Sequence, residues 1–351
     1  MEKKHYVIPI FVPHLGCPND CIFCNQRNIS GQMKQVTKED VKNTVEEYLK
    51  IFKDKNAYKE IAFFGGSFTG IDVETQKELL QVAYEYVRAK KVNSIRISTR
   101  PDYINKEILK MLKKYKVKTI ELGVQSSNDF ILQRAGRGHT FEDVKKASKL
   151  IRRYRFILGH QMMIGLPESS INDELKTATD LAKLKPKIMR IYPVLVIKGT
   201  QLEREYNEGK YRPLNVNQAV EICKEIYYYF NKKKINVIRI GLQTTDMICD
   251  PKNANSTVVA GPYHEAFRQL VEDGMWYDSI VKRIKALNVR VREIEVIVNP
   301  ENANNISGHK KENIRKLKEI YDVDLKVKQD PNMCKGNFDI KVLKVYKDFL
   351  D

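Results

Sequence analysis

The sequence predicts an α/β protein in which a partial or full parallel βα barrel precedes a small C-terminal α+β domain. Apolar strand-like runs alternate with amphipathic helix-like runs up to residue 242, a pattern typical of βα units. Most of the strand-like runs are largely apolar, as expected for parallel strands that are buried on both faces, and the run at 94–100 alternates. Polar or glycine-rich motifs follow several of these runs, where the sites of such barrels form.

The expected elements follow one another in a regular order. The expected strands cover residues 6–12, 60–64, 94–100, 119–124, 160–165, 189–196 and 237–242. The expected helices cover residues 38–53, with Thr37 as N-cap, then 75–90, 104–115, 141–153, 171–184 and 217–232.

The pattern changes towards the C-terminus. Residues 244–285 are less regular, with a helix expected over 263–272. Beyond them we expect a strand at 293–298, a polar loop at 300–308, a basic helix at 311–320, and strands at 324–328 and 338–342. The predicted domains are therefore residues 1–285 and 286–351.

Charge and cysteine usage narrow the class of protein. The chain of 351 residues has 62 Lys and Arg against 44 Asp and Glu, a formal charge of +18. This excess favours a polyanionic partner such as nucleic acid, and the alternative is a general lysine bias. No apolar run reaches 18 residues, so no membrane span is expected, and the N-terminal apolar run is too short for a signal peptide. Nothing marks the chain as secreted, which favours a reducing cytoplasm.

Three of the six cysteines, Cys17, Cys21 and Cys24, lie within eight residues. Thiolates suit iron–sulfur clusters, zinc and copper(I), and a cubane cluster usually takes four of them. Three thiolates without a fourth would leave one iron open to a small molecule, with Phe23 and Pro18 as possible shields. Zinc, with His14 as a fourth ligand, a disulfide, and buried free cysteines are the alternatives, all less favoured.

This spacing, with an aromatic residue before the last cysteine, resembles the radical S-adenosylmethionine superfamily. The resemblance implies a [4Fe-4S] cluster on Cys17, Cys21 and Cys24, and S-adenosylmethionine chelating the unique iron. It also implies a one-electron reductant and cleavage of the sulfonium to a 5′-deoxyadenosyl radical.

Further motifs after the strands could contact the cofactor. Gly65-Gly66-Ser67 allows a close backbone approach and resembles the superfamily's glycine-rich turn, which holds the methionine amino group. Arg100 could pair with the methionine carboxylate, a phosphate, Glu121 or an ordinary acid. Glu121 inside a barrel requires a buried partner or ligand. Gln125 and Ser126 could hydrogen-bond the ribose or the carboxylate, and residues 165–168 could line the adenine pocket. His139 could contact a ligand, but a place in the loop that caps the next helix is the simpler explanation. Tyr192, Lys198 and Thr200 face the expected substrate side.

The order of motifs FFGGSF, STRPDY, ELGVQS, RGHT, GLPE, YPVLVIKGT and VIRIGLQ resembles the radical domain of the Elongator catalytic subunit over about residues 5–245. The chain departs from that subunit in its cysteine spacing and is too short for its acetyltransferase domain, so acetyl chemistry on the wobble uridine is not implied.

Residues 305–316 place a glycine and several cations at a helix start, a weak match to a KH-type RNA-binding module in which Lys311 replaces the second glycine. A small cap with a solvated lysine face explains the same pattern and is slightly favoured. The first hypothesis is a radical enzyme acting on RNA, with tRNA the first candidate. The alternatives are a small-molecule radical enzyme related to anaerobic coproporphyrinogen oxidases, and a non-enzymatic iron–sulfur or zinc RNA-binding protein.

Overall fold

The computed structural model describes residues 4–12, 21–24, 36–244 and 247–346. The chain forms two compact units, one of residues 1–219 with 225–265 and one of residues 220–224 with 266–351.

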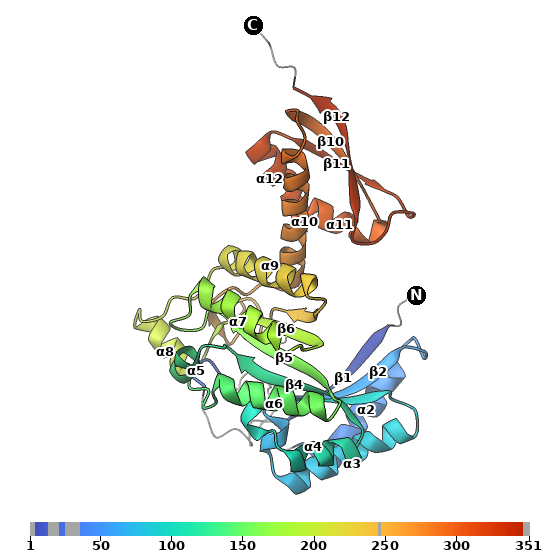
Figure 1. Cartoon of the computed structure of the whole chain (residues 1–351), viewed down its shortest axis with the longest axis vertical. Helices are drawn as coiled ribbons and strands as arrows, with labels where there is room; N and C mark the ends of the chain where they lie inside the picture. Colours follow the sequence, from blue (N-terminus) through green and yellow to red (C-terminus); the bar gives the residue numbers. More distant parts are fainter. Residues whose placement is uncertain (1–3, 13–20, 25–35, 245–246, 347–351) are drawn as a thin grey trace. The chain divides into compact units, whose positions relative to one another are not determined.

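The first unit is built on a parallel sheet that curls into a partial barrel (Figure 1). Seven strands lie in the order β1-β2-β3-β4-β5-β6-β8, and every neighbouring pair is parallel. Their bounds are β1 His5–Val12, β2 Tyr58–Gly65, β3 Ser94–Thr99, β4 Val117–Gln125, β5 Ile157–Ile164, β6 Ile188–Pro193 and β8 Asn236–Ile240. Because β1 and β8 form the two edges of the sheet, the barrel is partial rather than full.

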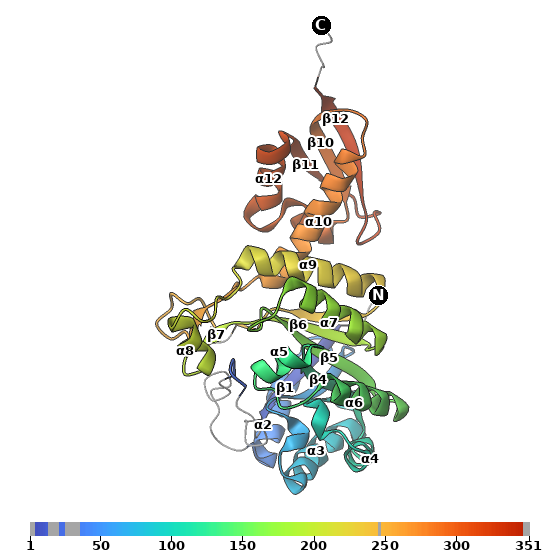
Figure 2. The ribbon, with the colours of Figure 1, turned by 60° about the vertical axis from the view of Figure 1, so that its left-hand side comes forward.

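Helices connect successive strands and cover the outside of the curl (Figures 1 and 2). They are α2 Lys38–Ile51, α3 Val73–Arg88, α4 Lys106–Lys114, α5 Asp129–Arg134, α6 Phe141–Arg153, α7 Ile171–Lys183, α8 Gln201–Asn207 and α9 Val216–Lys232. Their starts follow from capping side chains. Thr37 caps α2 through a capping box with Asp40, as expected, and Thr140 does the same for α6 with Asp143. Short β7 Val196–Ile197 and β9 Val258–Ala260 pair antiparallel in the same unit.

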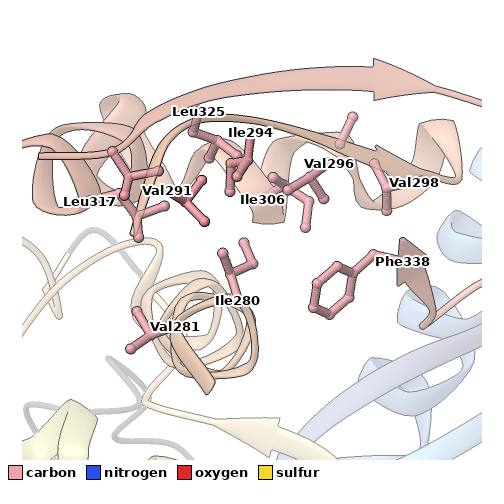
Figure 3. Packing of buried hydrophobic residues seen from close by; sticks show 12 residues of the cluster. Ile280, Val281, Val291, Ile294, Val296, Val298, Ile306, Leu317, Leu325 and Phe338 are labelled. Atoms are coloured by element: carbon pink, nitrogen blue, oxygen red, sulfur yellow. The ribbon is translucent and has the colours of Figure 1, made fainter. Parts of the chain in front are cut away.

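The second unit contains α10 Phe267–Lys285, β10 Val291–Val298, α11 Ala303–Ser307, α12 Glu312–Tyr321, β11 Asp324–Gln329 and β12 Phe338–Val345. The central strand β10 pairs parallel with β11 and antiparallel with β12. Its core joins this sheet to α10, where Ile280 and Val281 pack near Ile294, Val296 and Phe338 (Figure 3). This is the expected small α+β domain.

Two expectations for the C-terminal region were wrong. The polar loop expected at residues 300–308 contains α11, which forms because Ala303 and Ile306 are buried in the core. The helix expected at 263–272 is α10, which begins later and extends to Lys285. Helix α10 supplies Ile280 and Val281 to the core of the second unit, which includes residues 266–351, while the sequence predicts domains of residues 1–285 and 286–351.

Candidate active site

A cavity of about 400 Å³ opens at the carboxyl ends of the barrel strands. This volume lies within the usual range for small-molecule sites. Five residues predicted for the site line it: Phe23, Cys24, Gly65, Gln125 and Tyr192. The other lining residues are Val7, Phe11, Phe64, Ser98, Gln161, Met163, Arg190, Pro193, Leu195, Ile197, Arg239, Leu242, Gln243 and Ile248.

The glycine turn after β2 brings backbone to the cavity wall. Gly65 has a φ of 98°, and a Cβ there would lie 2.6 Å from the carbonyl oxygen of Val12 in the neighbouring strand. Only glycine fits this position, both for its backbone angle and for the close strand contact. Gly66 then donates its N–H to the same oxygen at 2.8 Å. Gly66 and Ser67 lie outside the cavity lining.

Gln125 at the end of β4 is held in an unusual conformation. Its φ is 74°, and the register between β4 and β5 shifts between Gly123 and Gln125. Such irregularities re-aim side chains and are common beside active sites. Its buried Oε1 has no hydrogen-bond partner in the part of the chain that the structure describes. The amide is therefore a polar group at the cavity wall with capacity for a ligand.

A buried network of charges fixes the barrel wall beneath the cavity. Glu121 is 1% exposed and accepts hydrogen bonds from Arg96 at 2.7 Å, from Arg190 at 2.5 Å and from Gln161 at 3.1 Å. Burial opposes ionisation of this carboxyl, but Arg190 and Arg96 outweigh it and hold the pKa of Glu121 below its usual value. Arg96 also pairs with buried Glu60 at 2.6 Å.

Gly159 on β5 provides the room that Glu121 needs. A Cβ at Gly159 would lie 2.9 Å from Cγ of Glu121 and 2.7 Å from Cγ1 of Ile188. The buried partner expected for Glu121 is thus a pair of arginines, and Glu121 lies outside the cavity lining. Its partners Arg190 and Gln161 do line the cavity, so Glu121 fixes two side chains that a ligand can reach.

Arg100 pairs with Asp102, through Nη2 at 2.9 Å and Nε at 3.0 Å. The Glu121 partnership that we considered for it is instead made by Arg96 and Arg190. Arg100 is 2% exposed and lies outside the cavity lining. His139 is buried with Nε2 3.3 Å from the carbonyl oxygen of Val124, and burial lowers its pKa to about 4. Its place between Gly138 and the α6 cap agrees with a structural role.

The described part of the cysteine segment fits an anionic metal cluster. Cys21 is buried, Cys24 is half-buried at the cavity, and the N–H of Cys24 donates to the carbonyl oxygen of Cys21 at 2.9 Å. Cys17 lies outside the described residues. Arg137 is 7% exposed and points Nη1 at the Cys21 sulfur, 3.4 Å away, while Nη2 donates to the carbonyl oxygen of Gly123 at 2.7 Å.

Arg137 has no carboxylate within 4 Å among residues 4–12, 21–24, 36–244 and 247–346, and its Nε has no hydrogen-bond partner there. A buried guanidinium without a counter-charge is costly. A cysteine thiolate, and still more a cluster with several thiolates, would supply the missing negative charge. The surroundings of Cys21 therefore suit a cluster ligand.

Sequence reasoning missed Gln161, Arg190 and Arg239 in the cavity wall and Arg137 beside Cys21. The sequence did contain a signal for Arg190 and Arg239, and also for Arg96 in the buried network. Each of these arginines interrupts an apolar strand run. A cation in a parallel strand must find a buried partner or a ligand. The contact of Arg137 with Cys21 joins residues 116 positions apart and has no local signal.

Comparison with known proteins agrees with this geometry. Residues 11–181 match the Radical SAM superfamily, and residues 186–277 match the Radical SAM C-terminal domain. An uncharacterized protein of Methanocaldococcus jannaschii is 33% identical over 63% of this chain and 70% of its own length. The tRNA uridine(34) acetyltransferase of the same organism is 30% identical over 46% of this chain, which matches only 34% of that enzyme's length.

The structure of Elp3 from Methanocaldococcus infernus superposes with a TM-score of 0.62 at 23% identity, covering 84% of this chain and 66% of the other. This likeness supports the fold. No helix among the described residues is long and apolar enough to cross a membrane. From its fold, its motifs and both matched segments, the chain belongs to the radical SAM superfamily and is an enzyme of the branch related to the radical domain of the Elongator catalytic subunit.

Proposed function

We propose that the chain holds a [4Fe-4S] cluster through Cys17, Cys21 and Cys24, binds S-adenosylmethionine in the carboxyl-end cavity, and acts on RNA, with tRNA the first candidate. The observation that carries the cofactor assignment is the cavity itself, which unites Cys24, Gly65 and Gln125 from three separate segments. Together these cofactors would supply reductive cleavage of the sulfonium to a 5′-deoxyadenosyl radical, with a one-electron reductant as partner and the cytoplasm as location.

The residues of the chain have distinct tasks in this proposal. The backbone of Gly65, Gly66 and Ser67 approaches the methionine end of the cofactor, because the turn carries no bulky side chain at its two glycines. Gln125 offers its unpartnered amide oxygen to a hydroxyl or ammonium donor of the ligand. Phe23 lines the cavity beside Cys24 and limits water at the cluster.

Three charged residues act less directly. Glu121 positions Arg190 and Gln161, since its carboxylate already accepts from both. Arg100 is committed to Asp102, so a contact with the methionine carboxylate would require sharing its guanidinium. Arg137 donates to Cys21 and offsets the negative charge of the thiolates.

An RNA substrate is supported by the formal charge of +18 and by the tRNA named in the related acetyltransferases. The matched region spans 34% of the length of that enzyme. The proposal therefore does not carry over the nucleotide that the acetyltransferase modifies or the group that it adds.

An anaerobic assay tests the proposal. The chain is reconstituted with iron and sulfide, given dithionite and S-adenosylmethionine, and assayed for 5′-deoxyadenosine, with Cys21→Ala as the control. We expect formation that the control abolishes, and a mass change in nucleosides of added unfractionated tRNA. Bound zinc in place of iron, with no cofactor binding, would overturn the cofactor assignment. Cleavage with no change in any nucleoside would favour a small-molecule substrate.

A further inference from the structure

A second hollow lies at the opposite end of the barrel, where the strands begin. Two adjoining depressions of about 820 and 450 Å³ share Lys113 and Arg155 and together form what we call the amino-end groove. Helices α3, α4 and α6 and the start of β4 supply most of its lining. It is lined by Tyr84, Val87, Arg88, Asn93, Lys106, Lys110, Lys113, Lys114, Lys116, Val117, Lys118, Leu150, Arg153, Tyr154, Arg155 and Phe156.

Every charged residue in this groove is a cation. The groove contains three arginines and six lysines and no carboxylate. The chain as a whole has 44 acids to 62 basic residues, so a random sample of its charged residues would include several acids. The net charge of the chain alone does not explain this segregation.

The groove cations also lack the ion pairs that other lysines of the same unit form. Lys77 pairs with Glu74 at 2.7 Å and Lys145 with Glu142 at 3.2 Å. Within the described ranges, none of the groove cations lies within 4.0 Å of a carboxylate. Lys113 donates instead to the carbonyl oxygen of Tyr154 and Lys118 to the hydroxyl of Tyr58, which leaves their charge unbalanced.

Stabilisation of helix ends explains only part of the cluster. Lys113, Lys114 and Arg153 lie in the last turns of α4 and α6, where cations favour the helix dipole. Lys106 is the first residue of α4, where the dipole opposes a cation.

Lys116 and Arg155 follow their helices and have φ angles of 60° and 61°. Glycine would adopt these left-handed angles with less strain.

We propose that the amino-end groove binds the phosphate backbone of RNA. This inference rests on the proposed RNA substrate and deepens it. A phosphate backbone carries closely spaced negative charges, and a surface that binds it needs cations but no acidic or apolar side chains. Protein interfaces are usually depleted of lysine in their centres, which makes an acidic protein a poorer fit. Tyr84, Tyr154 and Phe156 add aromatic surface among the cations.

The groove is separated from the cavity by the length of the strands. A strand of eight residues such as β5 spans about 26 Å. RNA in the groove therefore does not present its reacting nucleotide there. The groove serves as an anchor for a folded RNA that reaches the cavity with another part.

Two matched double variants test the groove. Lys116→Gly with Arg155→Gly removes two groove charges while giving glycine to two left-handed positions, so lost folding does not explain lost binding. Lys185→Gly with Lys234→Gly is the control. These two exposed lysines follow α7 and α9, have φ angles of 57° and 56°, and lie outside the groove lining.

Binding of unfractionated tRNA is measured by fluorescence anisotropy over a range of KCl concentrations. For the groove variant we expect Kd at about 0.1 M salt to rise roughly tenfold or more, and the slope of log Kd against log salt to fall by about 2. The control should stay within about twofold of the wild type.

Three results would overturn the assignment: an unchanged Kd in the groove variant, an equal loss in the control, or wild-type binding to polyglutamate as tight as to tRNA. Cleavage of S-adenosylmethionine by the wild type without RNA is scored separately, so failure of the radical reaction and failure of the groove are distinguishable.

Discussion

The two ends of the barrel differ in whether their charged side chains are buried and paired or exposed and without a carboxylate partner among the described residues. Beneath the carboxyl-end cavity the charges of Glu60, Arg96, Glu121 and Arg190 are enclosed, and each has an opposite partner within hydrogen-bond distance. In the amino-end groove the cations are exposed to water and have no carboxylate partner among the described residues. Burial makes an unpaired charge expensive, whereas water tolerates it. The comparison indicates that the paired charges build the site and the unpaired ones are free to meet a ligand.

The largest expected effect comes from breaking the buried network. Glu121→Ala leaves Arg190 and one side of Arg96 uncompensated inside the barrel. We expect it to lower the free energy of unfolding by about 3–5 kcal/mol, measured by urea denaturation. Glu74→Ala, which removes only an exposed partner of Lys77, should cost less than about 1 kcal/mol. Equal losses in the two variants would show that burial does not set the cost of leaving a charge without its partner.

Glu174 tests the same idea with a buried acid that has no cationic side chain within 4.0 Å among the described residues. It is 3% exposed, its Oε1 accepts from the N–H of Gly165, and its Oε2 has no partner among the described residues. Burial raises its pKa to about 7, partly offset by the hydrogen bond from Gly165. Because the folded pKa lies above the usual value, this group favours folding most below pH 4.5, and that contribution is lost as the pH rises through 7.

Glu174→Gln should remove this pH dependence. Between pH 4.5 and 8 the stability of the variant relative to the wild type should rise by on the order of 3 kcal/mol. Urea denaturation at both pH values gives this difference. A variant whose stability tracks that of the wild type at every pH would show that the carboxyl is not held neutral.

Arg137 is the buried cation whose counter-charge we assign to the cluster. Arg137→Met should lower the reduction potential of the cluster, because an added electron loses a nearby positive charge. A tenfold change in the one-electron equilibrium is about 59 mV, and we expect a shift of roughly that size in a potentiometric titration followed by electron paramagnetic resonance. Arg134→Met is the control, since Arg134 already pairs with Glu205 at 2.5 Å. Equal potentials in both variants would mean that Arg137 does not sense the cluster.

Much of the barrel was predictable because its signals are local. The capping boxes at Thr37 and Thr140 and the apolar runs of the parallel strands depend on neighbours within a few residues. Gly65 was identified for the same reason, since a glycine pair after a strand predicts a turn that carries no side chain.

The network around Glu121 was predicted only as a need for some buried partner. Its partners, Arg96 and Arg190, come from other strands, and which side chains meet depends on the register of the sheet. The amino-end groove was missed because its cations come from three helices, one strand and two turns. Along the sequence each of them resembles an ordinary solvated lysine or arginine.

The smallest expected effect is on stability at the amino-end groove, and its sign is informative. Lys110→Ala removes an exposed cation that faces other cations, so it should change the free energy of unfolding by less than about 0.5 kcal/mol. At low salt the change should be stabilising, since like-charge repulsion falls, and it should vanish above about 0.5 M salt as screening increases. Lys77→Ala should show the opposite sign at low salt, because it loses an attraction to Glu74. If Lys110→Ala also destabilises the protein at low salt, Lys110 makes favourable interactions within the fold. That result would contradict the idea that the groove cations are unpaired and can bind a polyanion.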